Sequence, residues 1–343
     1  MTQHVGGSTL RLAGDEPAEI TRAADILRAG GLVAFPTETV YGLGADAANN
    51  QAVAKIFVAK GRPADHPLIV HIASADELPQ WARDIPETAW VLAAQFWPGP
   101  LTLILKRARG VADAASGGLD TIGLRVPGHP VAQALLRAFG GGIAAPSANQ
   151  FGRISPTCAD HVRAELEGRI EAVIDGGPCA VGLESTILDL SSPLPRILRP
   201  GAVTLPMLEA ILGKLGDAPA TGAPKVPGSL EAHYAPATLL RLVKPQALDA
   251  EVARLAAVGT VVVLARHASQ SNVNLRWIRL PAEAAAYGHE LYARLREADA
   301  LGSACILIET PPDGAEWMAV NDRLQRAAVG SGRAKSARVE AKP

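Results

Sequence analysis

The chain has 343 residues, 48% of them hydrophobic and 4% aromatic, and its 33 basic and 34 acidic side chains leave a formal net charge of −1. This length and apolar content predict a globular protein of two domains. The balanced charge excludes a strong overall field for nucleic acid or a membrane surface, so local basic clusters would have to bind any such partner.

Cysteine usage and the lack of a long apolar run indicate a cytoplasmic protein. Cys158, Cys179 and Cys305 lie far apart and form no CxxC pair. This spacing argues against a zinc site or a disulfide framework and predicts buried thiols. The N-terminus has no apolar signal region, and the longest nearly apolar stretch, 255–265, is shorter than the roughly twenty residues of a membrane span. We therefore expect no membrane association.

Helical and strand-like periods alternate over the first part of the chain. A helix is predicted at 20–27, stopped by Gly30 and Gly31, and a strand follows at 32–35. Further helices are predicted at 52–59 and 88–96, and further strands at 68–72, 101–105, 121–126, 142–145, 172–174, 185–190 and 196–198. So many strands with fewer helices predict a large, twisted, mixed α/β sheet over residues 1–212.

The composition changes after this domain. Residues 213–237 are rich in Gly, Ala and Pro without an apolar period, which predicts a linker that acts as a lid. Beyond it, strands at 239–243, 260–264 and 304–308 alternate with helices at 248–257 and 284–298. This pattern predicts a smaller Rossmann-like α/β domain over 238–329, and the basic tail 330–343 is expected to be disordered.

The common nucleotide-binding and hydrolase motifs are absent: there is no GxxxxGK[ST], no GxGxxG after a strand, no HExxH and no GxSxG. Small polar residues beside Gly or Pro instead follow the predicted strands, in the segments PTETVYGLG (36–44), KGRPADHPLIVHI (60–72), TIGLRVPGHP (121–130), APSANQFGRISPT (145–157), GLESTILDL (182–190) and RILRPG (196–201). If these strand ends converge, their hydroxyls, N–H groups and cations form a concave site that suits a polyanion.

Each segment also has an ordinary structural interpretation. Threonines near strand ends commonly satisfy turns, and PSAN can be an Asx-type turn. Lys60 and Arg62 can form a solvated helix end, His66 and His71 are individually typical of hydrogen-bonded structural histidines, and Arg125 can form a structural salt bridge. The combination of segments, more than any one of them, favours a binding site.

In order and spacing, these segments resemble the threonylcarbamoyl-AMP synthase family, built on the YrdC-type domain. The resemblance covers 18–237 in ordered motifs and continues more loosely to 328, and the linker ending in HYAP is similar to that of the longer two-domain form. It implies that L-threonine, bicarbonate and ATP are joined into threonylcarbamoyl-AMP and pyrophosphate, the first step of N6-threonylcarbamoyladenosine formation in tRNA. Mg²⁺ would be held mainly by the triphosphate, with no metal ligands from the protein, and a partner transferase would act on the tRNA.

The resemblance also implies site residues. L-Threonine is expected near Thr39, His71, Arg125, Ala145 and Ser185, and the Arg125 guanidinium suits its carboxylate because it can form two parallel hydrogen bonds. The ATP site is expected to comprise Lys60, Arg62, His66, Thr121, Ser147, Asn149, Ser155, Arg199 and Tyr234. Lys60 and Arg62 are also expected to act in catalysis, by stabilising charge on the phosphoryl groups.

The segment PTETVYGLG is expected to form the floor of the threonine pocket. Pro36 should end the strand, Thr37 and Thr39 should point to opposite sides, and the glycines of this segment should let the backbone approach a ligand. The role of Glu38 stays open between holding neighbouring basic groups and contacting the substrate amine.

Two departures from the family pattern stand out. His66 occupies a position where the family often has asparagine, and residues 229–232 read Ser-Leu-Glu-Ala, which removes a basic residue from the linker. We expect the lid to hold the nucleotide less strongly as a result.

The alternative function is a non-catalytic double-stranded RNA-binding module, and a weak RNA contact is a possible partner interaction of the enzyme as well. The 4% aromatic content and the balanced charge argue against the RNA-binding module. A third interpretation is an accessory domain that adenylates carbamoyl phosphate, which the absence of a preceding acylphosphatase-like or zinc-finger segment does not favour.

Overall fold

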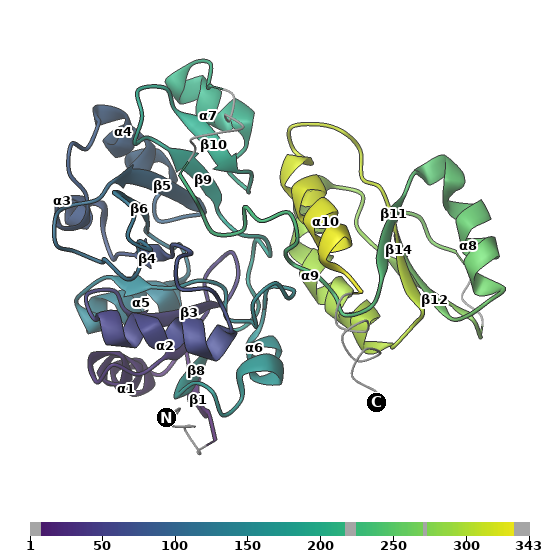
Figure 1. The fold of residues 1–343 in the computed structure, drawn as a ribbon, viewed down its shortest axis with the longest axis horizontal. Helices are drawn as coiled ribbons and strands as arrows, with labels where there is room; N and C mark the ends of the chain where they lie inside the picture. The colour runs from purple at the N-terminus through teal and green to yellow at the C-terminus, as the bar shows by residue number, and fades with distance from the viewer. Residues whose placement is uncertain (1–7, 217–223, 270–272, 333–343) are drawn as a thin grey trace. The chain divides into compact units, whose positions relative to one another are not determined.

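The computed structural model describes residues 8–216, 224–269 and 273–332 (Figure 1). The chain divides into two compact units. The first comprises Met1–Phe151 and Ser155–Ser229, and the second comprises Gly152–Ile154 and Leu230–Pro343. The division falls inside the segment predicted as a linker, and three residues from the middle of the first domain's sequence group with the second unit.

The first unit is built on a ten-stranded mixed sheet (Figure 1). In spatial order its strands are β1 (Leu10–Ala13), β8 (Ala172–Asp175), β2 (Val33–Phe35), β3 (Gly42–Asp46), β7 (Ile143–Ala144), β4 (Ile69–His71), β6 (Thr121–Arg125), β5 (Leu101–Lys106), β9 (Thr186–Asp189) and β10 (Arg196–Arg199). Strand pairs β1–β8, β2–β8, β4–β6 and β5–β9 are parallel, and the remaining neighbours are antiparallel. The predicted large mixed sheet is confirmed.

Helices cover the two faces of this sheet unequally. On one face, α1 (Pro17–Arg28) and α5 (Pro130–Phe139) share an apolar cluster with β1, β2, β7 and β8. A larger cluster on the other face includes residues of α2 (Asn50–Lys60), α3 (Leu78–Trp81), α4 (Glu87–Phe96), α6 (Ala159–Leu166) and α7 (Leu205–Leu212), with the short 3₁₀ turn η1 (Ala75–Glu77) preceding α3. The sheet therefore has a separate hydrophobic core on each face.

The face that carries α1 and α5 continues over β4, β6, β5 and β9. Ile143 belongs to the cluster under these helices and is the register partner of His71, so the His71 side chain points to the same side. On this part of the face lies a small apolar cluster, formed by Ile69, Ile104, Ile187 and Val226. Of these four, only Val226 comes from outside the sheet, and this stretch carries the candidate site.

Helix α2 shows how the local sequence places one site residue. The Asn49 side chain accepts the backbone N–H groups of Gln51 and Ala52 and so caps the helix, which ends at Gly61 in the left-handed conformation, with φ 62°. Lys60 is consequently the last helical residue, on a firmly bounded element.

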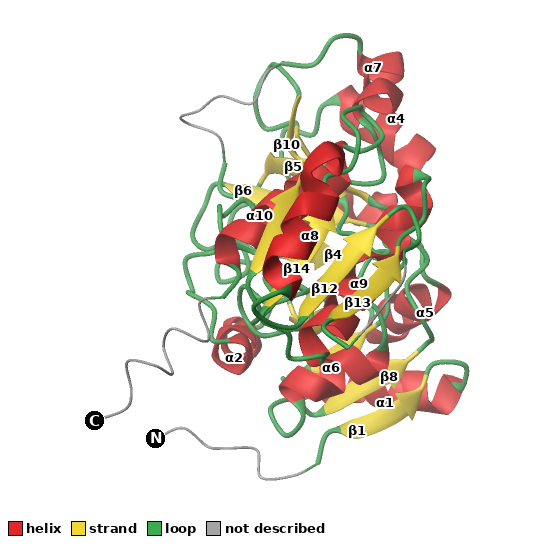
Figure 2. Cartoon of the chain, turned by 90° about the vertical axis from the view of Figure 1, so that its right-hand side faces the viewer, coloured by secondary structure: helices red, strands yellow, loops and turns green. Residues whose placement is uncertain are grey.

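The second unit contains a four-stranded parallel sheet in the order β11 (Leu240–Val243), β14 (Cys305–Glu309), β12 (Val261–Ala265) and β13 (Leu275–Arg279). Helix α8 (Leu248–Ala256), preceded by η2 (Pro245–Ala247), packs on one face, whereas α9 (Ala284–Ala300) and α10 (Met318–Gly330) lie on the other (Figures 1 and 2). The predicted smaller Rossmann-like domain is confirmed.

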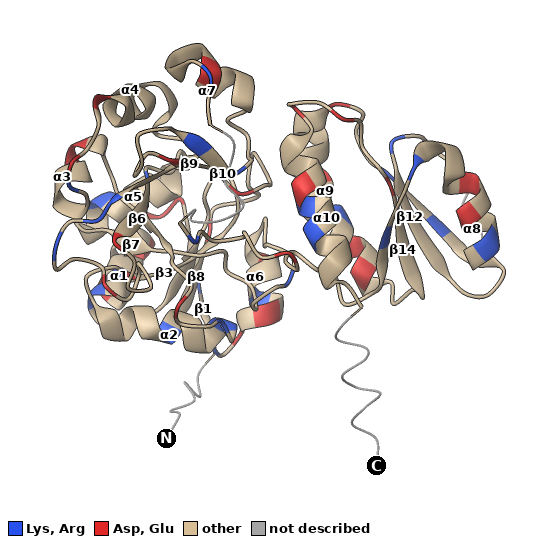
Figure 3. Cartoon of the chain, turned by 45° about the horizontal axis from the view of Figure 1, so that its top comes forward, with Lys and Arg blue, Asp and Glu red and all other residues tan. Residues whose placement is uncertain are grey.

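Charged residues of both signs are interspersed on the elements of each unit (Figure 3). On α9, for example, Arg294 pairs with Glu290 and Glu297. No helix among the described residues is long and apolar enough to cross a bilayer. The mixed charges on the described residues do not indicate a dominant patch of one sign.

Several elements were not predicted from the sequence, among them β1, β3, α3, α5, α7, β13 and α10. Of the tail predicted at 330–343, Gly330 belongs to α10 and Ser331 is buried, its hydroxyl accepting the Leu240 N–H at 2.9 Å, while residues 333–343 lie outside the described residues. All three cysteines are free; Cys179 and Cys305 are buried as predicted, but Cys158 is only half-buried, because it lies at the start of α6.

Candidate functional site

The chain turns sharply after β2, and hydroxyl groups hold the turn. β2 ends at Phe35, before Pro36, as predicted. The Thr37 hydroxyl donates to the Val40 carbonyl at 2.7 Å and accepts the Thr39 and Val40 N–H groups, both at 3.2 Å. The hydroxyls of Thr37 and Thr39 also lie 2.8 Å apart. The prediction that these two threonines point to opposite sides was wrong, because the chain turns here instead of continuing as a strand.

The two glycines of this segment serve internal packing. Gly42 and Gly44 lie in β3, and a Cβ on Gly44 would come within 2.8 Å of Ile143 and 2.9 Å of Phe35. A Cβ on Gly42 would lie 3.2 Å from Ala145. Both glycines admit neighbouring side chains of the sheet, and the expected close approach of a ligand to their backbone stays a prediction.

Arg125 is the centre of the predicted threonine site. Its Nη1 donates to the Thr39 hydroxyl at 2.9 Å, its Nη2 to Glu38 Oε1 at 2.6 Å, and its Nε to the Gly99 carbonyl at 3.1 Å. Only 4% of its side chain is exposed. A buried guanidinium fixed in this way is suited to receiving a small anion.

His71 lies beside Arg125, since the two residues are register partners at the ends of parallel strands β4 and β6. Burial, followed by the charge of Arg125, lowers the pKa of His71 to about 3. Its Nδ1 is buried without a hydrogen-bond partner among the described residues. The imidazole is therefore neutral at physiological pH and offers one unused polar atom.

Lys60 is buried at the end of α2, and its ammonium group donates to the Ser147 and Asn149 carbonyls, both at 2.5 Å. Burial and the neighbouring charge of Arg62 hold the pKa of Lys60 well below its usual range. An arriving polyanion would favour the charged form of this lysine. These contacts bring together three residues of the predicted ATP site.

Arg62 and His66 share an aromatic neighbour. The Arg62 guanidinium lies 5.7 Å from the centre of the Phe151 ring, and Nη2 donates to the Pro67 carbonyl at 3.0 Å. The His66 ring meets Phe151 edge-on at 5.6 Å. Partial burial, and then the charge of Arg62, lower the pKa of His66. Phe151 thus groups these two predicted residues, although the sequence analysis gave it no role.

Ser185 and Arg199 join the two predicted substrate sites. Arg199 donates to the Ser185 carbonyl through Nε and Nη2, at 3.1 and 2.9 Å, and to the Pro227 carbonyl through Nη1 at 2.9 Å. The Ser185 hydroxyl lies 2.7 Å from the hydroxyl of Thr102. Thr102 was not predicted, because a single threonine inside an apolar strand pattern carries no signal of its own.

Ser155 is fully buried, and its hydroxyl donates to Glu184 Oε1 at 2.5 Å. Glu184 was also missed, although it lies within the segment GLESTILDL. A buried carboxylate that fixes a hydroxyl orients the oxygen of that hydroxyl for a ligand.

Thr121 and Arg125 mark the extent of the site. They occupy opposite ends of β6 and, with Gly123 between them, lie on the same side of the strand. Four residues of strand span about 13 Å. Thr121 and Arg125 therefore do not meet at one sheet edge. The expectation that all of these strand ends converge does not hold for this pair.

Two predicted residues need separate description. The Ala145 N–H donates to the Ile69 carbonyl at 2.9 Å, so a ligand bond from Ala145 would have to come from its carbonyl oxygen. Tyr234 belongs to the second unit, where it is buried with a positive φ of 59°. Its ring stacks on Tyr292 at 5.8 Å and lies 5.2 Å from the Arg323 guanidinium.

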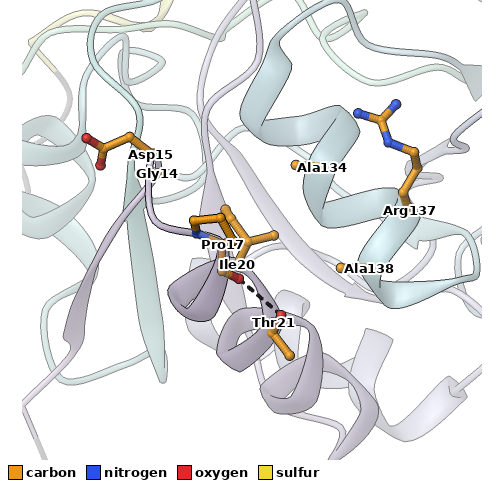
Figure 4. Close-up of a pocket in the computed structure, with 8 residues that line it drawn as sticks. All are labelled: Gly14, Asp15, Pro17, Ile20, Thr21, Ala134, Arg137 and Ala138. Atoms are coloured by element: carbon orange, nitrogen blue, oxygen red, sulfur yellow. Dashed lines mark hydrogen bonds between the residues drawn. The ribbon is translucent and has the colours of Figure 1, made fainter.

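A surface pocket of about 380 Å³ lies elsewhere in the first unit, between the start of α1 and the C-terminal half of α5 (Figure 4). Its lining includes Gly14, Asp15 and Arg137, and the Thr21 hydroxyl on its wall donates to the Pro17 carbonyl at 3.0 Å. None of the predicted site residues lines it, and the polar residues described above are the candidate site.

The donor set of this site suits an anion better than a bare metal ion. Lys60, Arg62, Arg125 and Arg199 are all buried, each with 3–8% of its surface exposed. Among the described residues, no group of three or more His, Cys, Asp and Glu side chains could hold a metal ion. A divalent ion that arrives on a triphosphate needs few protein ligands, and the cationic residues present fit that case.

Two protein families match the chain. The family described as "Telomere recombination", which includes the Sua5, YciO and YrdC proteins, matches residues 25–201. The family described as "Threonylcarbamoyl-AMP synthase, C-terminal domain" matches residues 203–329. Together these matches cover most of both units.

Individual relatives are similar to this chain in sequence and structure over almost its whole length. The threonylcarbamoyl-AMP synthase of Pyrococcus abyssi is 41% identical over 323 residues, covering 91% of this chain and 94% of the relative, and that of Bacillus subtilis is 41% identical over 335 residues, covering 94% and 96%. The crystal structure of P. abyssi Sua5 complexed with L-threonine superposes with a TM-score of 0.87 at 39% identity, covering 94% of this chain and 98% of that one.

Proposed function

Because the chain belongs to the threonylcarbamoyl-AMP synthase family, we propose that it forms L-threonylcarbamoyladenylate and pyrophosphate from L-threonine, bicarbonate or CO₂, and ATP. The protein is an enzyme, a nucleotidyltransferase by this reaction. The resemblance seen in the sequence is thereby confirmed at the level of the family.

The observation that carries this proposal is the presence of two kinds of buried polar group in the first unit. Arg125, Thr39 and His71 form a small buried pocket wall for an amino acid. Lys60 with Ser147 and Asn149 forms a cationic wall for phosphates. Arg199, assigned to ATP, donates to the carbonyl of Ser185, assigned to L-threonine, which supports a reaction that joins an amino acid to a nucleotide.

We assign the residues to substrates accordingly. L-Threonine is bound by Thr39, His71, Arg125, the Ala145 carbonyl and Ser185, and ATP is bound by Lys60, Arg62, His66, Thr121, Ser147, Asn149, Ser155, Arg199 and Tyr234. A buried Ser185 hydroxyl already oriented by Thr102 and Arg199 supports selection of a substrate with matching polar groups.

The chemistry has two steps. The threonine amine attacks the carbon of CO₂, forming an N–C bond with loss of a proton, and the product is a carbamate. A carbamate oxygen then attacks the α-phosphorus of ATP, a new P–O bond forms, and the bond to the bridging oxygen breaks so that pyrophosphate leaves. The carbamate reverts easily in water, so the burial of Arg125 and Ser185 supports the reaction by keeping water out.

The cations stabilise the charge that develops during the second step. Lys60 and Arg62 act on the phosphoryl oxygens, and Arg199 helps to hold the nucleotide in line with the attacking oxygen. If Mg²⁺ is bound through the triphosphate, it would supply further positive charge there, while Lys60, Arg62 and Arg199 would hold the phosphates themselves.

We further propose that residues 213–237 act as a lid between a catalytic domain over 1–212 and the small domain over 238–329. Val226 packs on Ile69, Ile104 and Ile187, and the Pro227 carbonyl is held by Arg199, so this part of the segment covers the sheet beside Ser185. Tyr234 would contribute its ring to the bound nucleotide.

The product is a substrate for a transferase that modifies tRNA, which is the proposed partner, and we place the reaction in the cytoplasm, where ATP and tRNA are available. Any direct RNA contact of this chain is expected to be weak.

Pyrophosphate release tests the proposal. The purified full-length protein is expected to release pyrophosphate from ATP only when L-threonine and bicarbonate are both present. Release of pyrophosphate from ATP when carbamoyl phosphate replaces L-threonine and bicarbonate would favour the accessory-domain alternative. Binding of double-stranded RNA without any release would favour the RNA-binding module.

A further inference from the structure

Both carboxylate oxygens of Glu38 have defined partners. Oε1 accepts the Arg125 Nη2–H at 2.6 Å, and Oε2 accepts the Gly128 N–H at 2.9 Å. The Glu38 carbonyl accepts the Val181 N–H at 2.7 Å, and 14% of the side chain is exposed. The carboxylate is therefore held in one place, between the turn after β2 and the loop after β6.

The hydrogen bonds of Arg125 leave a specific pair of donors. A guanidinium has five N–H groups. Three of them go to Gly99 on one segment and to the adjacent Glu38 and Thr39 on another, and together these contacts fix the plane of the group. One N–H remains on each terminal nitrogen, and two such donors match the two oxygens of a carboxylate.

We propose, resting on the proposed function, that Glu38 is a positioning residue for the amino-acid substrate. It holds the Arg125 guanidinium in the orientation in which the two remaining N–H groups receive the carboxylate of L-threonine. Glu38 itself does not contact the reacting atoms. Glu38 therefore affects how tightly L-threonine binds and does not affect the rate of the chemical step.

Glu38 could also weaken L-threonine binding, so the direction in which the affinity changes when Glu38 is removed tests the proposal. A negative charge 2.6 Å from Arg125 also weakens the attraction of the guanidinium for another carboxylate. If that repulsion dominated, removing Glu38 would tighten threonine binding. The geometry favours positioning, because without Glu38 the guanidinium keeps only two of its three contacts and the Gly128 N–H loses its acceptor.

The test uses the full-length variants Glu38→Ala and Glu38→Gln. Pyrophosphate release is measured against L-threonine concentration at saturating ATP and bicarbonate, and L-threonine binding is measured by calorimetry. Loss of a buried charge-assisted hydrogen bond should raise the KM and Kd for L-threonine about 10- to 100-fold in Glu38→Ala. The kcat and the KM for ATP should stay near the wild-type values. Glu38→Gln keeps one acceptor for Arg125 and should lie between the wild type and Glu38→Ala.

Glu171→Ala is a matched control for general loss of stability. The Glu171 carboxylate also accepts a backbone N–H, that of Leu32 at 2.7 Å, and it contacts none of the proposed site residues. This variant should be less stable with an unchanged KM for L-threonine. In the Arg125→Ala background, Glu38→Ala should add no further increase in KM, because Glu38 acts through Arg125.

The outcomes separate this inference from the proposed function. If the wild-type protein releases no threonine-dependent pyrophosphate, the proposed function is wrong and this inference falls with it. If the wild type is active but folded Glu38→Ala has an unchanged or lower KM for L-threonine, only the positioning role is overturned. Should Glu38→Ala fail to fold, Glu38→Gln decides by the same criterion.

Discussion

At the scale of single residues, the candidate site contains two titratable groups whose pKa values are lowered. His71 and Lys60 are both buried, and burial is the main cause that lowers the pKa of each. A neutral imidazole next to Arg125 adds no second positive charge to the proposed L-threonine site. A triphosphate bound beside Lys60 would favour the charged form of this lysine and oppose the lowering of its pKa.

The burial of His71 predicts a loss of stability in acid. The pKa of His71 is about 3 in the folded protein, below the usual 6.5, so the unfolded chain binds more protons between these values. The free energy of unfolding should therefore fall as the pH falls from 6.5 towards 3, and His71 should account for about 2 kcal/mol of that fall by pH 4.5. Urea denaturation at several pH values measures it.

In the His71→Asn variant, the free energy of unfolding should fall less between pH 6.5 and 4.5 than in the wild type, and the difference should equal the contribution of His71. His289→Asn, at an exposed position on α9, serves as the control and should keep the wild-type slope. An acid limb of equal slope in His71→Asn and the wild type would contradict the assignment.

At the scale of elements, β3 explains why the segment after β2 contains two glycines. The strand runs antiparallel to β2 and to β7 and lies between them, so its glycines face neighbouring strands closely. The turn that joins β2 to β3 presents Glu38 and Thr39 to Arg125. Packing of β3 and presentation of the substrate site are thus properties of one continuous segment.

Gly44→Ala should destabilise the first unit. The added Cβ would lie 2.8 Å from Ile143, 2.9 Å from Phe35 and 3.1 Å from the Val33 carbonyl oxygen. Overpacking of this kind costs about 1–3 kcal/mol, which urea denaturation would detect. In Gly259→Ala, the added Cβ meets only Ala304, at an ordinary 3.4 Å, so this control should change stability little. Equal stability of the two variants would argue against the packing role of Gly44.

At the scale of the whole molecule, the second unit has its own core and also holds Tyr234. The Tyr234 ring is buried against Tyr292 and the Arg323 guanidinium, two residues of helices α9 and α10. The small domain therefore fixes the conformation of the residue that we propose to act on the nucleotide.

Arg323→Met should weaken ATP binding because it removes the cation that packs over the Tyr234 ring. We expect the KM for ATP to rise several-fold while the KM for L-threonine stays unchanged, measured by pyrophosphate release. Arg294→Ala removes an exposed ion-pair network on α9 and should leave both constants unchanged. An unchanged KM for ATP in folded Arg323→Met would contradict the proposed role of Tyr234 in ATP binding.

Local periodicity predicted those elements whose apolar pattern repeats within one segment. Strand β5, for example, alternates Leu101, Leu103 and Leu105 towards the larger core, and its predicted and observed positions agree closely. β3 and β1 escaped prediction for different reasons: β3 reads as a glycine-rich loop, and β1 buries one of its four residues. Short strands of this kind are stabilised by their neighbours rather than by their own sequence.

The order of the polar motifs was enough to identify the family and its two-domain form, because a motif keeps its residue types and spacing whatever surrounds it. Which side chains meet was decided only in the folded chain. The pairs Glu38–Arg125, Thr102–Ser185 and Ser155–Glu184 each join residues far apart in the sequence. Such contacts depend on strand order and register, which arise when the whole sheet assembles around its two cores.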